Sequence, residues 1–352
     1  MYRKLIRLIL IAIVGSVIAA SYGYYKVTSW SQERAFADAA SNEDGTIIEF
    51  PSGTGLSKLA KTLYENRLID STKMFELFVR INGDYNKFQA GKYRFLESVS
   101  PLEIVTKIRK GDIYWPVIVE YTIPEGFTLR KIADRLAANG IGHIKQLDTL
   151  LMDPTFAKSL KVPADTFEGF IYPATYQYIK MPSPQEAISH MVDTFWKKLP
   201  KNYEANAKKR GLSLKDAITF ASLIELETKR DEERSIISEV IWSRLKDRAP
   251  LAIDAALIYG IKDYRGDIKW IHLRDAKNPY NTRIHKGLPP TPIGSPSVES
   301  LKAVLTPTNT GAYFYVLHPN SDKHHFSKTH KEHQQYVRKL VEAHRRNKSN
   351  NK

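Results

Sequence analysis

Two glutamates that directly follow an apolar stretch are the residues of this sequence best suited to acid–base chemistry. Residues 217–224 are apolar or small throughout, which predicts a helix buried on most sides, and Glu225 and Glu227 come next. Glu225 continues the apolar row of Leu214 and Ile218 with helical spacing. A carboxyl group on such a row either finds a partner or is kept protonated by desolvation. A protonated carboxyl near neutral pH is the general acid that glycosidic cleavage requires.

The spacing of these glutamates limits how they act together. Side chains two positions apart on a helix point about 200° away from each other, so Glu225 and Glu227 are not expected to form a facing pair. At most one of them should enter a given cleft. A structural role is the competing interpretation, in which Glu225 forms a buried ion pair with Arg234 or Arg244. Periodicity alone leaves both interpretations open.

An aromatic segment and a proline-rich loop have compositions that suit the walls of a sugar-binding groove. Residues 167–176 combine aromatic rings with one acid, Glu168. Sugars stack their C–H faces on rings while their hydroxyls bond carboxylates. Core packing uses the same rings, and Glu168 is the residue that packing does not explain. The loop of residues 287–296 holds four prolines, so we expect a stiff wall there.

Metal and cysteine chemistry are not predicted. The sequence contains no cysteine, which excludes disulfides, thiolate metal sites and a cysteine nucleophile. Five histidines lie within residues 318–333, but they lack an accompanying acidic pattern and an HExxH motif. We therefore expect no metal and no cofactor, and we interpret these histidines as ordinary loop polarity.

An internal repeat predicts the elements that must position these residues. When the chain is shifted by 73 residues, segment 50–60 lies over segment 123–133, and each copy predicts a short strand, a Pro-x-Gly turn and a helix. The first copy continues into a second helix near residues 72–81 and a returning strand near residues 92–95. The result is a βααβ module. Such a module either binds glycans in the groove between its helices and a strand, or serves as a duplicated packing unit.

The charge distribution argues against a nucleic-acid-binding protein. The net charge is +15, but residues 323–352 hold nine Lys and Arg against two Glu, and Arg3, Lys4 and Arg7 add three more positive charges. About +5 remains for the long middle of the chain. A middle region this close to neutral does not predict a nucleic-acid-binding surface. We therefore expect no nucleic-acid partner.

An uncharged stretch near the N-terminus predicts a membrane span. Residues 8–25 carry no charge and follow a cluster of three positive residues. At helical rise this stretch is about 27 Å long, close to the hydrocarbon thickness of a bilayer. The positive cluster should stay in the cytoplasm, which places the rest of the chain on the outer side of the inner membrane. Residues 18–20 form a poor cleavage site, which favours a single-pass anchor over a cleaved signal peptide.

Several separate motifs occur in one order along the chain. That order is Phe167-Glu-Gly-Phe-Ile-Tyr-Pro-x-Thr-Tyr176, Ala221-Ser-Leu-Ile-Glu-x-Glu-Thr228, Glu233-Arg234, Arg244-Leu245, Asp254 with Ile258-Tyr-Gly260, Tyr280-Asn-Thr282, Gly287-Leu-Pro-Pro290 and His324-x-Phe-Ser-x-Thr329 with Glu332-His333. Together these motifs resemble the endolytic murein transglycosylase (YceG-like) family. The likeness covers essentially the whole chain.

The resemblance implies an α+β fold in which an N-terminal transmembrane helix precedes a duplicated strand–turn–helix region, described as a LysM-like βααβ module, and an α/β catalytic domain. On this sequence the expected segments are a cytoplasmic basic stub at 1–7, a transmembrane anchor at 8–25, a tether at 26–45, a LysM-like module at 46–115, a transglycosylase catalytic domain at 116–340 with the second repeat at 117–141, and a basic tail at 341–352.

The resemblance also implies an activity. It implies a membrane-anchored lyase that cleaves the MurNAc–GlcNAc bond within nascent peptidoglycan strands and leaves 1,6-anhydro-MurNAc ends. Glu225 is then the single catalytic glutamate, acting first as general acid and then as base. The implied substrate-binding residues are Glu168, Ser222, Asp254, Asn281, Thr282, Leu288, Pro289, Pro290 and His324. The implied partners are glycan strands, the inner membrane and the synthases that supply new strands.

This sequence departs from the family pattern at three places. Only Asp254 remains of a usual Gln-Thr-Asp triplet, Ala174 stands where an Asp is usual, and Arg283 replaces an expected Tyr. These changes affect the expected substrate contacts more than the reaction type, because Glu225 and its flanking residues are kept. A catalytically weak or inactive peptidoglycan-binding scaffold is the alternative function.

Overall fold

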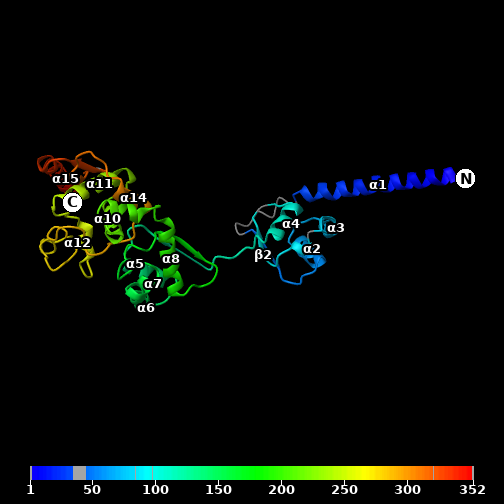
Figure 1. Cartoon of the computed structure of the whole chain (residues 1–352), viewed down its shortest axis with the longest axis horizontal. Helices are drawn as coiled ribbons and strands as arrows, with labels where there is room; N and C mark the ends of the chain where they lie inside the picture. The colour runs from blue at the N-terminus through cyan, green and yellow to red at the C-terminus, as the bar shows by residue number, and fades with distance from the viewer. Residues whose placement is uncertain (1, 35–44, 84, 97, 320, 351–352) are drawn as a thin grey trace. The chain divides into compact units, whose positions relative to one another are not determined.

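The computed structural model describes residues 2–34, 45–83, 85–96, 98–319 and 321–350 (Figure 1). It divides into two compact units, Met1–Pro116 and Val117–Lys352. Helices and strands are mixed in both units, as the predicted α+β class requires. The strands of the described residues pair as two-stranded antiparallel sheets, β1 with β2, β3 with β4 and β5 with β6.

The N-terminal helix α1 (Tyr2–Gln32) is long and apolar enough to cross a membrane. It continues past residue 25, where the apolar span was predicted to end, and residues 26–32 of the expected tether are therefore helical. Val27 and Ser31 are buried against the first unit, and Trp30 Nε1 donates a hydrogen bond to Asp70 Oδ1 at 2.6 Å. Residues 35–44 of the expected tether lie outside the described residues.

The first unit contains the βααβ arrangement predicted from the first repeat. Its elements are β1 (Thr46–Phe50), α2 (Leu56–Glu65), α3 (Thr72–Asn82), a 3-10 turn (Tyr85–Lys87), β2 (Gly91–Phe95) and α4 (Pro101–Lys110). Strand β1 pairs antiparallel with β2, with Ile48 opposite Tyr93 at the centre of the buried face. Helix α4 begins with a capping box between Ser100 and Glu103.

The second unit opens with the second copy of the repeat. Its elements are β3 (Val119–Ile123), α5 (Leu129–Ala138), α6 (Ile144–Leu151), α7 (Pro154–Ser159) and β4 (Ala174–Tyr178). Strand β4 comes from the aromatic segment and returns to pair antiparallel with β3, with Tyr176 opposite Tyr121. The second copy therefore also closes into a strand pair. That either copy is LysM-like stays a prediction.

A buried helix, α10, forms the centre of the second unit. The helices that follow β4 are α8 (Pro184–Lys198), α9 (Tyr203–Lys209), α10 (Leu214–Glu227), α11 (Asp231–Lys246), α12 (Asp254–Tyr259), α13 (Trp270–Leu273) and α14 (Val298–Leu305). Residues 217–225 of α10 are all buried, and α9, α11, α12 and α14 pack around this helix. Ser213 caps its N-terminus, accepting a hydrogen bond from the Asp216 N–H.

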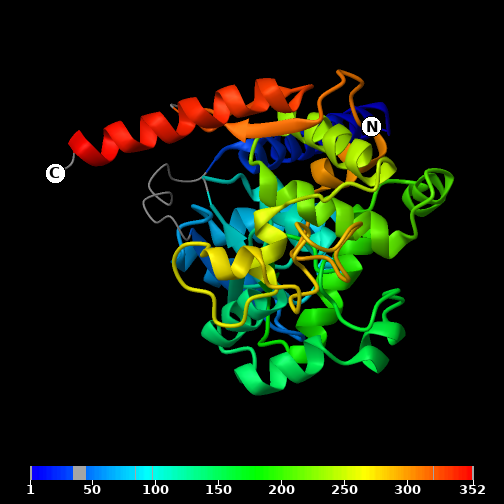
Figure 2. The same ribbon diagram turned by 90° about the vertical axis from the view of Figure 1, so that its left-hand side faces the viewer.

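The chain ends in a hairpin and a helix. These elements are β5 (Phe314–Leu317), β6 (His324–Ser327) and α15 (His330–Asn350), and Figure 2 shows the red helix lying along the orange hairpin. Strand β5 begins at Phe314, and its residues are only half-buried or exposed. A two-stranded sheet covers little of its own surface, which accounts for this exposure. Helix α15 reaches Asn350, so the predicted basic tail is largely helical.

Candidate active site

The C-terminal end of α10 opens into a cavity of about 930 Å³, which we call the acidic cavity. Four parts of the second unit form it: the turn before α5, the end of α10, the start of α11 and the β5–β6 hairpin. The described residues that line it are Pro124, Glu125, Gly126, Glu225, Leu226, Glu227, Thr228, Lys229, Arg234, Leu317, Asp322 and His324. Two of the predicted site residues, Glu225 and His324, therefore share one cavity.

The carboxyl group of Glu225 is held through one of its two oxygens. Oε2 accepts hydrogen bonds from the backbone N–H of Ser297 at 2.7 Å and from the Ser297 hydroxyl at 2.5 Å. Ser297 is the N-cap of α14, and its hydroxyl oxygen also accepts from the Ser300 N–H at 3.2 Å. Oε1 accepts no hydrogen bond from any residue that the structure describes. The carboxyl is thus fixed in place with one oxygen left for a ligand.

Arg234 is the ion-pair partner of Glu225. Its Nη1 lies 3.1 Å from Glu225 Oε2, and the two side chains are 8% and 5% exposed. The guanidinium also donates to the Ser300 hydroxyl at 2.5 Å and to Asp231 Oδ1 at 2.9 Å. The ion pair of the competing interpretation is therefore present, and Glu225 also lines a cavity. That Glu225 is catalytic stays a prediction.

Glu227 lies in the same cavity as Glu225, so the expectation that only one of them enters a given cleft was wrong. Helix α10 ends at Glu227, and Thr228 already has extended backbone angles. A cavity that wraps around a helix end is lined by side chains from opposite helix faces, because no further turn separates them. Tyr315 donates its hydroxyl to Glu227 Oε2 at 2.7 Å. Burial raises the pKa of Glu227, and the Tyr315 hydrogen bond partly offsets this effect.

His324 is oriented by a carboxylate from α11. Glu233 Oε2 lies 2.8 Å from His324 Nδ1, and Glu233 Oε1 accepts the His324 backbone N–H at 2.7 Å. Thr228 also donates its hydroxyl to Glu233 Oε2 at 2.8 Å. Burial alone raises the pKa of Glu233, but the hydrogen bonds from His324 and Thr228 outweigh it and lower that pKa. With Nδ1 engaged by Glu233, Nε2 is the ring nitrogen left for a ligand.

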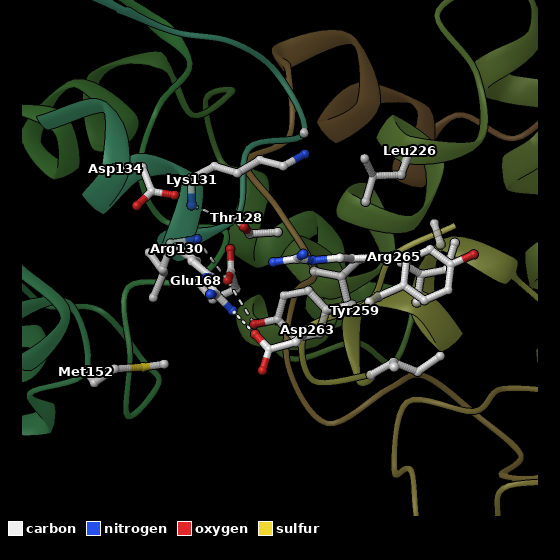
Figure 3. A pocket seen from close by; sticks show the side chains of 17 residues that line it. Thr128, Arg130, Lys131, Asp134, Met152, Glu168, Leu226, Tyr259, Asp263 and Arg265 are labelled. Atoms are coloured by element: carbon white, nitrogen blue, oxygen red, sulfur yellow. Dashed lines mark hydrogen bonds and ion pairs between the residues drawn. The ribbon is translucent and has the colours of Figure 1, made fainter. Parts of the chain in front are cut away.

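Glu168 lines a second cavity of about 700 Å³, which we call the distal cavity (Figure 3). Glu168 Oε2 accepts the N–H of Leu129 at 3.1 Å and the hydroxyl of Tyr259 at 2.8 Å, while its Oε1 is buried without a partner in the described structure. Burial raises the pKa of Glu168 to about 7, against the opposing effect of these hydrogen bonds. Gly126 and Leu226 line both cavities.

The turn of the second repeat is tied to the proline-rich loop. Gly126 N–H donates to the Ser295 carbonyl at 2.8 Å, and Ser295 N–H donates to the Phe127 carbonyl at 2.9 Å. The Ser222 hydroxyl of α10 accepts the N–H of Ile293 at 3.0 Å. Ser222 is fully buried, and its hydroxyl also donates to the Thr219 carbonyl of α10 at 2.7 Å. The repeat, the glutamate-bearing helix and the loop are thereby fixed relative to one another.

Asp254, Asn281 and Thr282 are not among the residues that line either cavity. Asn281 is buried and donates to the carbonyls of His272, Leu273 and Asp275. Thr282 is buried and its hydroxyl oxygen accepts the Ile253 N–H at 2.9 Å, which fixes the residue before Asp254. Asp254 itself pairs with Arg283, with Oδ1 and Nη2 2.5 Å apart. Leu288, Pro289 and Pro290 likewise line neither cavity.

Sequence reasoning did not identify Ser297, Tyr315 or Tyr259 as parts of the site. Ser297 precedes an apolar helical stretch, which is an N-cap signal, but nothing in that signal points to Glu225. Tyr315 and Tyr259 stand 88 and 91 residues from the glutamates to which they donate. Single-sequence patterns report local periodicity and carry no information about such distant contacts.

Comparison with known proteins gives consistent matches. A sequence profile described as the YceG-like family matches residues 48–339. A Bacillus subtilis (strain 168) protein named endolytic murein transglycosylase is 30% identical over 310 residues, which cover 84% of this chain and 85% of that protein. A protein of the same name from Streptococcus pneumoniae serotype 2 (strain D39) is 24% identical over 331 residues, covering 86% of this chain and 60% of the relative. A 2.6 Å crystal structure of a yceG-like protein from Listeria monocytogenes matches with a TM-score of 0.56 and 27% identity, over 82% of this chain and 98% of that one.

Proposed function

This chain belongs to the YceG-like family, and from that premise we propose that it is an endolytic murein transglycosylase. In this proposal it cleaves the MurNAc–GlcNAc bond inside peptidoglycan strands and leaves 1,6-anhydro-MurNAc ends. Glu225 is the catalytic acid and base. The observation that carries the proposal is the arrangement of this one carboxyl, which is nearly buried, fixed through Oε2 and free at Oε1 beside a large cavity.

The hydrogen bonds at Glu225 determine which oxygen carries the proton. Oε2 already receives donors from Ser297 and Arg234, so a proton on that oxygen would face other hydrogens. The proton of the acid form therefore belongs on Oε1, which has no partner among the described residues and is the oxygen left for a substrate. A fixed donor next to the scissile bond contributes through orientation as well as acidity.

In the proposed reaction Glu225 first donates a proton and then accepts a different one. Oε1 gives its proton to the glycosidic oxygen as the bond from that oxygen to C1 breaks, and the alcohol leaves. Positive charge at C1 is held by the ring oxygen or by the N-acetyl group of the substrate. The C6 hydroxyl of the same sugar then attacks C1, and its proton passes to Oε1. The anhydro ring is closed, Glu225 is again protonated, and no water has been consumed.

Glu227 gives a specific reason to consider hydrolysis as the second candidate. Ordinary glycosidases use two carboxylates, one as acid and the other as nucleophile or base. Glu225 and Glu227 both line the acidic cavity, and burial raises the pKa of Glu227. Hydrolysis would leave reducing ends in place of anhydro ends. The chemistry of the product thus distinguishes the two reactions directly.

The other predicted residues divide into two proposed roles. His324 and Glu168 line the cavities, and we assign them direct contacts with the sugar. Ser222, Asn281 and Thr282 use their polar atoms on the protein itself, so their proposed role is to hold the walls in position. Asp254 and residues 288–290 are proposed to shape the approach to the site.

The decisive experiment is product analysis with Glu225→Gln. Purified full-length protein is incubated with isolated glycan strands, and the released fragments are identified by mass spectrometry. Glu225→Gln should remove anhydro products, because Gln cannot donate a proton, while binding to the strands persists. Glu232→Gln, on an exposed glutamate of α11, is the matched control and should keep full activity. An active Glu225→Gln variant would refute the assignment, and reducing ends from the wild type would favour hydrolysis.

An inactive wild type that still binds strands would indicate the alternative function, a peptidoglycan-binding scaffold. The three departures from the family pattern, at Ala174, Asp254 with its neighbours and Arg283, make this outcome a meaningful one to test. Restoring a Tyr at position 283 is the first change to try in that case, because Arg283 now occupies Asp254 through an ion pair.

We also propose that α1 anchors the enzyme in the inner membrane, with the second unit on the outer side. The support is the length and apolar character of the helix. In this setting the first unit, as a LysM-like module, holds the strand near the membrane, where synthases release it. Removal of residues 2–25 leaves Val27 and Ser31 in place. This truncation should convert a protein that needs detergent for extraction into one recovered in buffer, and continued detergent dependence would contradict the proposal.

A further inference from the structure

The acidic cavity and the distal cavity are neighbours separated by one contact. Gly126 and Leu226 line both of them. A Cβ atom placed on Gly126 would lie 2.8 Å from Leu226 Cδ2, so this glycine and this leucine touch. We call this contact the Gly126–Leu226 ridge. A flexible polymer lying in the acidic cavity need only cross this ridge to enter the distal cavity.

The lining of the distal cavity suits a saccharide. Apolar groups make up most of the exposed surface of the cavity, and charged side chains such as Arg130, Asp263 and Arg265 lie among them. Apolar walls with polar groups that orient a ligand are typical of small-molecule sites. The apolar members include Leu129, Ile258 and Ile293. The aromatic ring of Tyr259 lies beside them, and Figure 3 shows its hydroxyl next to the Glu168 carboxyl and the Arg265 guanidinium extending into the same space. Apolar faces stack on sugar C–H groups while the polar groups bond hydroxyls.

In this cavity, one carboxylate oxygen of Glu168 has no hydrogen-bond partner among the described residues. The residue is 3% exposed, and its Oε2 is engaged by Leu129 and Tyr259. Its Oε1 is buried and has no partner in the described part of the chain. A buried polar atom without a hydrogen-bond partner is unfavourable. A ligand group that donates a hydrogen bond to it removes this free-energy cost on binding. A sugar hydroxyl or an N-acetyl N–H is such a group.

We propose that the distal cavity is a second saccharide subsite, on the other side of the Gly126–Leu226 ridge from Glu225, and that Glu168 Oε1 is its hydrogen-bond anchor. The proposal rests on the proposed function, because the ligand is a further sugar of the strand that Glu225 cleaves. A strand held on both sides of the ridge presents an internal bond to Glu225. Short oligosaccharides that fill only the acidic cavity lack this anchor and should be poor substrates.

The test measures how activity depends on strand length. The probes are uncrosslinked peptidoglycan oligosaccharides of increasing length, cleaved by the full-length protein. In the wild type, kcat/KM should rise with length and then level off once the distal cavity is filled. The assays are run above pH 7, where the Glu168 carboxyl is ionised and Oε1 is an acceptor. There Glu168→Gln replaces the acceptor with an amide donor and should reduce kcat/KM on long strands about tenfold, with little change on the shortest cleaved substrate. Glu204→Gln, an exposed glutamate of α9, is the matched control.

Two further measurements keep the test decisive. Met152→Trp fills the rim of the distal cavity from an exposed position and should flatten the length dependence even if Glu168→Gln folds poorly. In the Glu225→Gln background, the affinity for fluorescently labelled strands should rise with length, and Glu168→Gln should remove the rise. Equal length dependence in all variants would overturn the subsite. If the wild type forms no anhydro products, the proposed function is overturned instead. Failure of the subsite and failure of the proposed function are therefore distinguishable.

Discussion

Glu225 and Arg234 form a buried ion pair in which Glu225 Oε2 lies 3.1 Å from Arg234 Nη1. The pair engages only one carboxylate oxygen, and Ser297 shares that oxygen through its N–H and its hydroxyl. A carboxyl fixed in this way has a defined orientation, while its second oxygen remains available to a ligand. The pair therefore acts as a support for the proposed catalytic group and does not remove it from the cavity.

Breaking this ion pair should be costly. Arg234→Met leaves a buried carboxylate without its counterion, which typically lowers the free energy of unfolding by about 3–5 kcal/mol. Arg283→Met breaks the pair with Asp254, whose partners are 36% and 52% exposed, and should cost less than about 1 kcal/mol. Urea unfolding of both variants checks this contrast. Similar losses for the two would show that the Glu225 pair is not effectively buried.

The cap of α14 should affect both stability and activity. Ser297→Ala removes the N-cap of this helix and one donor to Glu225, at a cost of about 1–2 kcal/mol. Ser213→Ala removes the N-cap of α10 without touching Glu225, so it should show a similar loss of stability with normal cleavage. Thermal melting and strand-cleavage rates of the two variants provide the comparison. Normal cleavage by Ser297→Ala would show that its hydroxyl is not needed to orient the carboxyl.

Glu168 should make stability fall as the pH rises towards neutrality. Burial raises its pKa from 4.5 to about 7. Between these values the folded state keeps a proton that the unfolded state has released, so the free energy of unfolding decreases with increasing pH. The contribution is fully present below the unfolded pKa and is lost as the pH passes through the folded one, with a full effect on the order of 3 kcal/mol. Glu168→Gln cannot ionise and should flatten this decline in urea unfolding, whereas an unchanged slope would contradict it.

The Gly126–Leu226 ridge can be tested with a glycine from the other repeat. Gly126 and Gly53 occupy matching turns and both have positive φ, at +71° and +79°. An alanine at either position should cost about 1–2 kcal/mol through backbone strain. At Gly126 the new Cβ would also meet Leu226 Cδ2 at 2.8 Å, whereas nothing lies within 4 Å at Gly53.

Gly126→Ala should therefore destabilise the protein more than Gly53→Ala, as measured by thermal melting. Adding Leu226→Ala to Gly126→Ala should recover the part of the loss that comes from the contact. Equal losses of stability for the two alanine variants would show that Leu226 moves away from the new Cβ without a measurable loss of stability.

The sequence by itself determined the elements whose signals are local. The helical row that ends in Glu225 and the apolar stretch of α1 follow from spacing within a few turns, and the structure has both. The repeat predicted strand, turn and helix in both copies for the same reason. Local patterns suffice here because the hydrophobic period of a helix or strand reports which face is buried.

Only the tertiary structure decided what surrounds the glutamates. Ser297 reaches Glu225 across 72 residues of chain, and Tyr315 reaches Glu227 across 88. The shared cavity arises because α10 stops at Glu227 and the β5–β6 hairpin covers its end, which helix spacing cannot anticipate. Such contacts depend on how separate elements pack, and side-chain periodicity along one element contains no record of its neighbours.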